Sequence, residues 1–236
     1  MENMFTELKA TLLSGGAALV GFADVSILPN EARRGFDRAI SFAVSLDPAI
    51  VAALTQGPIP AYAGEYERAN HLLSDLGDLG AASLRQQGYR AEAQRPTIRA
   101  DDQLSTPLPH KTAATRAGLG WVGKCALLIT PQFGAAVRLV TTLTDAPLPP
   151  NTPVTASRCG TCRACVDACP AGVMSGSEWF PGKPRQEFYD ASACREMARR
   201  LSKAQAIGAT LCGICIRACP HTGKWLNNFG VLSSGQ

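Results

Sequence analysis

The stretch that decides the fold reads Cys159-Gly-Thr-Cys162-Arg-Ala-Cys165-Val-Asp-Ala-Cys169-Pro170. Its cysteines follow one another at intervals of three, three and four residues, the spacing that is typical of 4Fe–4S ligation. Three thiolates on one short loop reach different irons of one cubane, whereas the fourth ligates the other cluster of a two-cluster protein. The stretch therefore predicts a second cysteine set elsewhere in the chain.

That second set lies near the end of the sequence and reads Cys212-Gly-Ile-Cys215-Ile-Arg-Ala-Cys219-Pro220, with alanine at position 209 where a further cysteine would complete the repeat. The last cysteine of each motif ligates the cluster of the other motif. Cys169 therefore binds the second cluster, and Cys219 binds the first. Cys194, the remaining cysteine of this region, fills the vacancy. We expect one cluster to be bound by Cys159, Cys162, Cys165 and Cys219. We expect the other to be bound by Cys169, Cys194, Cys212 and Cys215.

Zinc sites and disulfides fit the cysteine pattern less well. Zinc sites would use cysteine pairs, and a third cysteine three residues further on is unusual there. Disulfides are disfavoured without a secretion signal, because cytosolic thiols are kept reduced. Clusters that only staple a small domain together remain compatible with the pattern. Cys125, outside the cysteine-rich region, is expected to be a buried apolar thiol rather than a ninth ligand.

Composition is that of an ordinary globular protein. The 236 residues are 46% hydrophobic and 18% charged, with a formal net charge of +4, and they suffice for one large domain or two modest ones. No basic run argues for nucleic acid. The acidic N-terminal segment is not a signal peptide, and no run of about 18 apolar residues predicts a membrane span. We expect a cytoplasmic protein.

Hydrophobic patterning predicts an α+β arrangement in the first part of the chain. Helices are expected over 2–13, 65–87 and 111–116. Buried strands are expected over 17–22 and 39–46, and two more, 126–130 and 135–143, are joined by the turn at 131–134. The proline-rich segment 147–153 predicts a boundary between a domain of residues 1–150 and a cysteine-bearing domain of residues 151–236, with a helix over 191–201.

With both halves in view, the chain resembles the epoxyqueuosine reductase family, relatives of the reductive dehalogenases. The resemblance rests on Ala117-Gly-Leu-Gly-Trp-Val-Gly-Lys124, on Leu143-Thr-Asp-Ala-Pro-Leu148, and on the cysteine layout with Tyr189-Asp190 before Cys194. It covers about residues 105–225. Full-length members continue into a C-terminal helical-repeat region that grips tRNA, so a short member without that extension is expected.

The resemblance implies an α+β domain, similar to nitroreductases, that holds cobalamin against a ferredoxin-like domain with two 4Fe–4S clusters. Electrons would pass from reduced ferredoxin or flavodoxin through the clusters to cobalt, which attacks an epoxide or another electrophilic carbon, while the protein supplies orientation and electrostatics. tRNA is the implied macromolecular partner, and no membrane is involved.

In this scheme a glycine-rich turn faces the corrin. Its glycines let the backbone approach a flat macrocycle, its tryptophan packs against it, and its lysine pairs with a propionamide or a phosphate. The candidate cofactor-binding residues are Gly118, Gly120, Trp121, Gly123 and Lys124. The alternative is a tight turn that packs the sheet against the cluster domain.

The candidate catalytic residue is Glu65. The family's proton-donor aspartate lies in an Arg-Asp-Tyr-His string, and the match here is Gly64-Glu65-Tyr66-Glu67. A buried carboxylic acid with a raised pKa is able to donate a proton, whereas the alternative is a solvated glutamate in the first turn of a helix. His110 is expected to face the cofactor or to be a cap or core residue, and His221 to hydrogen-bond near a cluster.

Three functions compete. The first is an iron–sulfur oxidoreductase similar to epoxyqueuosine reductase, in which two clusters feed a cobalamin. The alternative is a ferredoxin-like electron-transfer protein that serves a corrinoid or flavin partner without its own catalysis. An RNA-binding protein with structural clusters is disfavoured, because the positive charges are scattered and no aromatic–basic string is present.

Overall fold

The computed structural model describes residues 2–97 and 104–231. The elements of the first half are α1 (Glu2–Ser14), β1 (Leu19–Asp24), α2 (Asn30–Arg33), β2 (Arg38–Ser45), α3 (Pro48–Ala52), α4 (Pro60–Gln86), β3 (Ala91–Ala93) and α5 (His110–Arg116). The elements of the second half are β4 (Trp121–Val122), β5 (Leu128–Ile129), β6 (Val137–Thr144), α6 (Ala164–Asp167), the 3-10 turn η1 (Arg185–Glu187), α7 (Ala191–Ala204), α8 (Ile214–Ala218) and α9 (Pro220–Asn227). The expected α+β class is confirmed.

The chain forms two compact units that alternate along the sequence. The first comprises Met1–Ser45, Ala69–Gly120 and Arg138–Val154, and the second comprises Leu46–Arg68, Trp121–Val137 and Thr155–Gln236. The last change of unit, after Val154, falls just beyond the proline-rich segment that predicted a boundary near residue 150. The second unit also includes two segments from the first 150 residues, Leu46–Arg68 and Trp121–Val137. No proline-rich segment was recognised at the ends of these two segments, so the sequence did not predict them.

The first unit is built on a four-stranded sheet in the order β1-β2-β6-β3. β1 and β2 are antiparallel, with Val20 opposite Phe42 and Gly21 opposite Ser41. Successive side chains of a strand point to opposite faces, so this register gives the sheet one face with Phe42 and another with Gly21.

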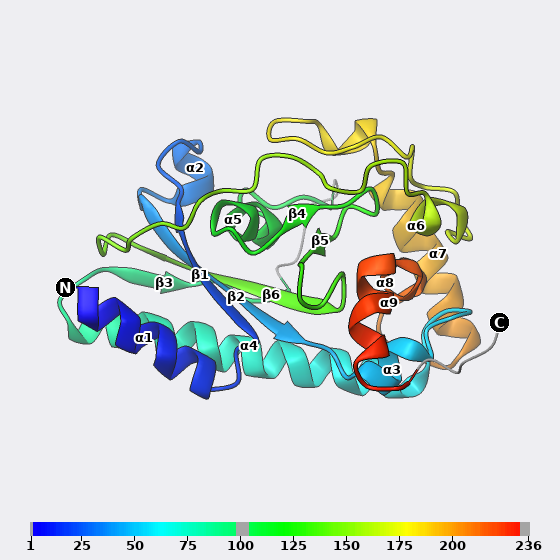
Figure 1. Ribbon diagram of the computed structural model, residues 1–236, viewed down its shortest axis with the longest axis horizontal. Coiled ribbons are helices and arrows are strands. Elements are labelled where there is room, and N and C mark those ends of the chain that lie inside the picture. The colour runs from blue at the N-terminus through cyan, green and yellow to red at the C-terminus, as the bar shows by residue number, and fades with distance from the viewer. Residues whose placement is uncertain (1, 98–103, 232–236) are drawn as a thin grey trace. The chain divides into compact units, whose positions relative to one another are not determined.

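Helices cover both faces of this sheet (Figure 1). On one face, α4 brings Gly80 so close that an added Cβ would lie 3.1 Å from the Phe42 ring. On the other, α5 packs on β1 and β2, and a Cβ at Gly21 would lie 2.5 Å from the carbonyl oxygen of Ala117. Small residues at these two positions therefore set how closely the helices approach the sheet.

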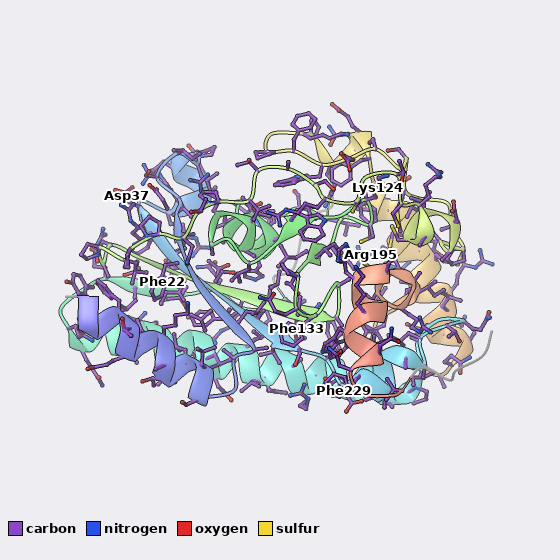
Figure 2. All side chains as sticks on the ribbon, viewed as in Figure 1. Phe22, Asp37, Lys124, Phe133, Arg195 and Phe229 are labelled. Carbon is purple, nitrogen blue, oxygen red and sulfur yellow. The ribbon has the colours of Figure 1, made fainter. Side chains whose placement is uncertain are left out.

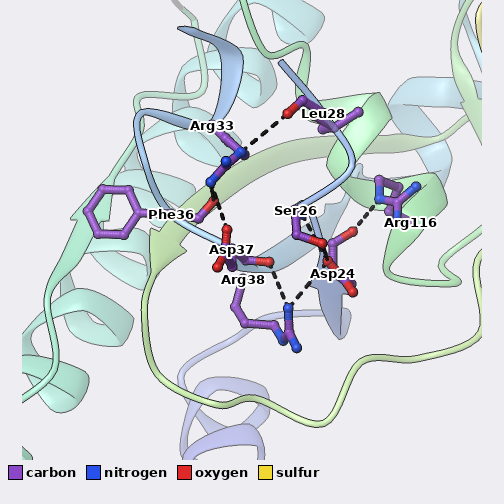
Figure 3. A network of polar contacts seen from close by, with 8 residues as sticks. All are labelled: Asp24, Ser26, Leu28, Arg33, Phe36, Asp37, Arg38 and Arg116. Atoms are coloured by element: carbon purple, nitrogen blue, oxygen red, sulfur yellow. Dashed lines mark hydrogen bonds and ion pairs between the residues drawn. The ribbon is translucent and has the colours of Figure 1, made fainter. Parts of the chain in front are cut away.

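A polar network lies where β1 ends and β2 begins (Figure 3). The Asp24 carboxylate accepts hydrogen bonds from the Ser26 hydroxyl at 2.6 Å and the Ser26 amide at 2.8 Å, and Arg38 lies 3.3 Å from it. The hydrogen bonds from Ser26, followed by the charges of Arg38 and Arg116, hold the pKa of Asp24 below its usual value. Arg116, at the end of α5, also donates to the Asp24 carbonyl, so the network ties helix to sheet.

The second unit is a set of short helices around α8, which packs against α3, α6 and α9. Gly213, before α8, has φ +90° and would place a Cβ 2.7 Å from Leu54, so only glycine fits both its conformation and its space. Arg217 Nε donates to the Ala52 carbonyl at 3.1 Å. The hairpin of β4 and β5 belongs to the same unit.

An aromatic row supports α9 within the second unit. The rings of Phe133 and Trp225 meet edge to face at 6.0 Å, and those of Trp225 and Phe229 at 5.5 Å (Phe133 and Phe229 are labelled in Figure 2). Beside it, the Thr222 hydroxyl accepts the Ala135 amide at 3.0 Å. These contacts fix the start of α9, where Cys219 lies.

Most expected elements are present, and the differences have physical reasons. The helix expected from residue 65 begins at Pro60, because proline is favoured in the first turn of a helix. The strands expected over 126–130 and 135–143 exist in shortened and shifted form but belong to different sheets. The polar segment 94–109, whose prolines predict a loop, lies partly outside the described residues. Within the described residues, none of the helices has the length and apolar content that a membrane crossing needs.

Candidate iron-sulfur centres

A short winding loop carries the first three cysteines of the predicted set. The Cys162 amide donates to the Cys159 carbonyl at 3.1 Å, and Gly160 between them has φ +54°, a conformation that glycine adopts without strain. Cys165 lies in α6, one turn further on. The loop and the start of α6 therefore place Cys159, Cys162 and Cys165 around a common space.

That space is a cavity lined by sulfur. It holds about 460 Å³ of empty volume, part of it open to solvent, and its lining includes Cys159, Cys162, Cys165 and Cys219. Cys169 is absent from the lining. The structure therefore gathers the four residues expected for one cluster, including Cys219 from the second motif.

Cys219 reaches the cavity because it lies at the junction of two helices. It ends α8 and precedes α9, with Pro220 as the first residue of the new helix. Burial raises the pKa of its thiol, whereas backbone amides of Thr222 and His221, which hydrogen-bond to the sulfur, act in the opposite direction. Amide donors at a helix N-terminus favour a thiolate, which is the form that binds iron.

The second predicted set also comes together. Burial raises the pKa of Cys194, and the neighbouring Cys169 acts in the same direction. The Cys212 thiol is likewise buried and lies within electrostatic range of both Cys194 and Cys169. α7 positions Cys194 because Asp190 caps it, with its carboxylate accepting the Ala193 amide at 2.9 Å.

Tyr189 links the fourth member of this set to the others. Burial raises the pKa of its phenol, and the nearby Cys194, to which it hydrogen-bonds, and Cys215 add to the effect. The described residues contain no group of three His, Cys, Asp or Glu side chains that converges on a single ion. A cubane places each thiolate on a different iron, so it requires a cage of sulfurs such as the cavity.

Lys124 holds the cluster loop. The side chain (labelled in Figure 2) is only 5% exposed, and its Nζ donates to the carbonyl oxygens of Gly160 at 2.6 Å and Cys162 at 3.0 Å. In the corrin scheme this ammonium would pair with a propionamide or a phosphate of the cofactor. It instead fixes the loop that carries two predicted iron ligands, and it lines the same cavity.

In the turn at 118–124, which was expected to contact a corrin, Gly118 and Gly123 lie against other parts of this chain. A Cβ at Gly118, which has φ +72°, would lie 2.8 Å from the Thr152 carbonyl oxygen. A Cβ at Gly123 would lie 2.7 Å from Ile129 across the hairpin, and Gly120 is buried. The space that these glycines leave is filled by protein, which favours the tight-turn alternative.

Trp121 is 2% exposed and packs edge to face on His221 at 5.0 Å, with the Arg158 guanidinium 5.6 Å from its ring. Its indole Nε1 is a buried donor without a partner among the described residues. The contacts of Gly118 and Gly123 favour a tight turn, and the role of residues 118–124 in cofactor binding stays a prediction.

Glu65 is neither solvated nor free. It is 6% exposed, and its carboxylate accepts the Asp47 amide at 2.8 Å and both Arg68 Nε and Nη2 at 2.6 and 2.7 Å. The alternative of a solvated glutamate is wrong, because the side chain points inward to the start of α3. The three hydrogen bonds support a structural role, and catalysis by Glu65 stays a prediction without support from the geometry.

The histidines differ in their surroundings. His110 Nε2 donates to the Arg95 carbonyl at 2.9 Å, so Nδ1 accepts the Thr141 hydroxyl at 3.0 Å. His110 therefore ties the loop at Arg95 to β6, which is the core role among the expected alternatives. His221 lines the sulfur cavity, close to where the sequence placed it.

Comparisons with known proteins agree with this picture. Residues 158–222 match the family described as the 4Fe-4S double cluster binding domain. An epoxyqueuosine reductase of Aliivibrio fischeri is 32% identical over 155 residues, which are 62% of this chain and 39% of that protein. This chain spans 21 to 41% of the length of the curated epoxyqueuosine reductases that it matches.

Solved structures share the fold over most of the chain. A reductive dehalogenase described as B12-dependent has a TM-score of 0.68 at 21% identity, with 92% of this chain and 31% of that chain covered. An epoxyqueuosine reductase with an epoxyqueuosine-modified tRNA-Tyr stem loop has a TM-score of 0.62 at 18% identity, with 92% and 65% covered. This chain is therefore similar to epoxyqueuosine reductases in sequence, shares their fold, and carries a 4Fe-4S double cluster binding domain.

Proposed function

We propose that this chain is an iron–sulfur oxidoreductase, similar to epoxyqueuosine reductases, that relays electrons through two 4Fe–4S clusters to an electrophilic substrate. The observation that carries the proposal is the sulfur-lined cavity, because it joins Cys219 to the first three cysteines of the earlier motif and leaves Cys169 out. Crossed ligation of this kind belongs to two-cluster proteins. A reducing compartment, the cytoplasm, suits such free thiols.

We propose that an acidic electron-transfer protein, a ferredoxin or flavodoxin, is the donor. α7 carries the predicted ligand Cys194 and, on its exposed side, the cations Arg195, Arg199, Arg200 and Lys203. Glu196 pairs with Arg199 at 2.9 Å, which leaves the helix with an excess of positive charge. Such a surface attracts an acidic partner and speeds its encounter, and it would bring the donor near the second predicted cluster.

The substrate class follows from the relatives. We propose an epoxide, and epoxyqueuosine in tRNA as the first candidate, on the strength of the sequence similarity. Reduction of an epoxide to an alkene consumes two electrons and two protons and releases the oxygen as water. Each cluster passes one electron at a time, so the two electrons pass through the clusters one after the other.

Cobalamin is a proposed cofactor on the strength of the fold likeness alone. Because the turn at 118–124 is engaged by its own chain, we assign no residue to it. The contacts of that turn favour, as second candidate, an electron-transfer protein that passes electrons to a corrinoid or flavin partner.

Anaerobic reconstitution of the full chain tests the proposal. We expect about eight iron and eight sulfide per chain and two reducible clusters by electron paramagnetic resonance (EPR). A chain that retains corrinoid and reduces epoxyqueuosine-modified tRNA is the reductase. Two clusters with turnover only after a corrinoid or flavin protein is added would identify the electron-transfer protein, and failure to take up more than one cluster would refute both.

A further inference from the structure

A segment between the two cysteine motifs lies against the loop of the first predicted cluster. This segment, residues 175–188, is here called the strap, and a hydrogen bond from the Ser175 amide to the Phe188 carbonyl at 3.1 Å joins its ends. The strap and the cluster loop, residues 157–163, both belong to the second unit. The strap contains no predicted iron ligand, so its contacts with the loop call for a different explanation.

Two hydrogen bonds join the strap to the cluster loop. Glu178 Oε1 accepts the Gly160 amide at 2.7 Å, and the Trp179 carbonyl accepts the Ser157 amide at 3.2 Å. The Trp179 side chain packs against a small apolar cluster that contains Phe188. The backbone at Trp179 is therefore anchored on both sides, and it places the neighbouring carboxylate of Glu178 at the loop.

Lys183 holds the part of the strap that carries Glu178. Its Nζ donates to the Ser177 hydroxyl at 2.9 Å and to the Glu178 carbonyl at 2.7 Å, and it lies 5.7 Å from the centre of the Phe188 ring. Because the strap is already ordered by these contacts, the hydrogen bond from Gly160 to Glu178 has less conformational entropy to offset.

Gly160 is held at both its N–H and its carbonyl group. The N–H donates to Glu178, and the carbonyl accepts Lys124 Nζ at 2.6 Å. Gly160 directly follows the predicted ligand Cys159. Lys124 is buried, whereas Glu178 is exposed, so solvent screens the charge of the glutamate. What Glu178 supplies to the loop is therefore chiefly a hydrogen-bond acceptor.

We propose that Glu178 is a positioning residue that keeps the Gly160 amide away from the sulfurs of the first cluster and keeps the reduction potential of that cluster low. Hydrogen bonds to cluster sulfurs are among the factors that set such potentials, because they stabilise the more negative, reduced state. An N–H that already donates to a carboxylate does not supply one. The inference rests on the proposed two-cluster assignment.

The test compares E178A, which removes the acceptor, with E178Q, which keeps an amide oxygen in its place. Full-length chains are reconstituted anaerobically, titrated by EPR and exposed to an iron chelator, and the first cluster is identified as the one that C219S lacks. In E178A we expect a more positive midpoint potential of the first cluster. We also expect about threefold to tenfold faster release of its iron, the effect of one hydrogen bond weakened by solvent. E178Q should stay close to the unsubstituted chain in both measurements.

Two controls accompany the comparison. The potential of the second cluster, measured in the same titration, should not change in E178A. E187Q removes the charge of another exposed carboxylate of the strap and should change neither potential.

Each other outcome overturns a stated part of the proposal. An unchanged potential and unchanged iron release in E178A would mean that water replaces Glu178 without effect. Equal shifts in E178A, E178Q and E187Q would assign the effect to net charge. Faster iron release at an unchanged potential would refute the effect of Glu178 on the potential.

A further variant covers a failure of E178A to fold. E178D shortens the side chain and withdraws the carboxylate from Gly160, so a potential in E178D equal to that in E178Q would refute the role of the hydrogen bond. An unsubstituted chain that takes up fewer than two clusters would refute the proposed function instead.

Discussion

The Nζ atom of Lys124 lies 2.6 Å from the carbonyl oxygen of Gly160, within the loop that carries the first predicted iron ligands. Because this lysine is buried, its charge is poorly screened by water and acts on whatever the loop holds. A cation here offsets the negative charge of a thiolate-bound cluster.

Replacement of Lys124 should weaken this loop. K124M removes two charge-assisted hydrogen bonds, each worth about 1.5–3 kcal/mol, so we expect faster iron loss to a chelator and a more negative potential of the first cluster. K124R keeps the charge and should retain most of the iron. Chelator kinetics and EPR titration measure these effects, and identical iron loss in K124M and the unsubstituted chain would contradict the assigned role.

Crossed ligation predicts which cluster each substitution removes. C219S should abolish the first cluster. C169S and C194S should each abolish the second, although Cys169 is the next cysteine after Cys165 in the first motif. Each variant should lose about half of its iron, since each cluster holds four. EPR of the remaining cluster distinguishes them. If C169S and C165S leave the same cluster behind, ligation is not crossed.

Glu65 is expected to affect stability more than turnover. E65A leaves the Asp47 amide without the acceptor of a part-buried hydrogen bond, which costs about 0.5–1.5 kcal/mol, and it removes a partner of Arg68. The half-exposed Arg68 adds less, because solvent screens it. Thermal unfolding should show a lower Tm, with E65Q less affected since its amide oxygen still accepts. A folded E65Q without substrate reduction would restore Glu65 as a catalytic residue.

His110 should make stability depend on pH. Burial, the largest cause, and then the charge of Arg138 lower its pKa from the usual 6.5, although the hydrogen bond to Arg95 opposes them. The unfolded chain therefore binds more protons, so stability is present above about pH 6.5 and falls as the pH drops toward the folded-state pKa. Urea unfolding between pH 5 and 8 measures the slope. H110Q should flatten it.

The cationic side of α7 should control reduction by a protein donor. R195E combined with R200E should lower the rate of reduction by an acidic ferredoxin or flavodoxin about tenfold or more at low ionic strength. The difference should shrink as salt is added. Reduction by dithionite, which needs no docking surface, serves as the control. A variant that binds tRNA less well but accepts electrons normally would assign this surface to RNA.

Local spacing was sufficient to predict the cluster region. Intervals of three residues place thiolates on one loop whatever surrounds them, so the sets that contain Cys159 and Cys212 could be read from the chain. The same holds for the helices and for β2, where apolar periodicity reflects which side of an element is buried.

Tertiary packing decided the rest. Lys124 and Glu65 have contacts with groups that are distant in the sequence and that no local pattern specifies. The two strands flanking Pro131 entered different sheets, because β5 pairs with the neighbouring β4, whereas β6 pairs with β3, a strand distant in the sequence. The sequence alone determined which residues are suited to bind iron. Only the folded chain determined which sulfurs share a cavity, because the cavity is formed by segments that are far apart in the sequence.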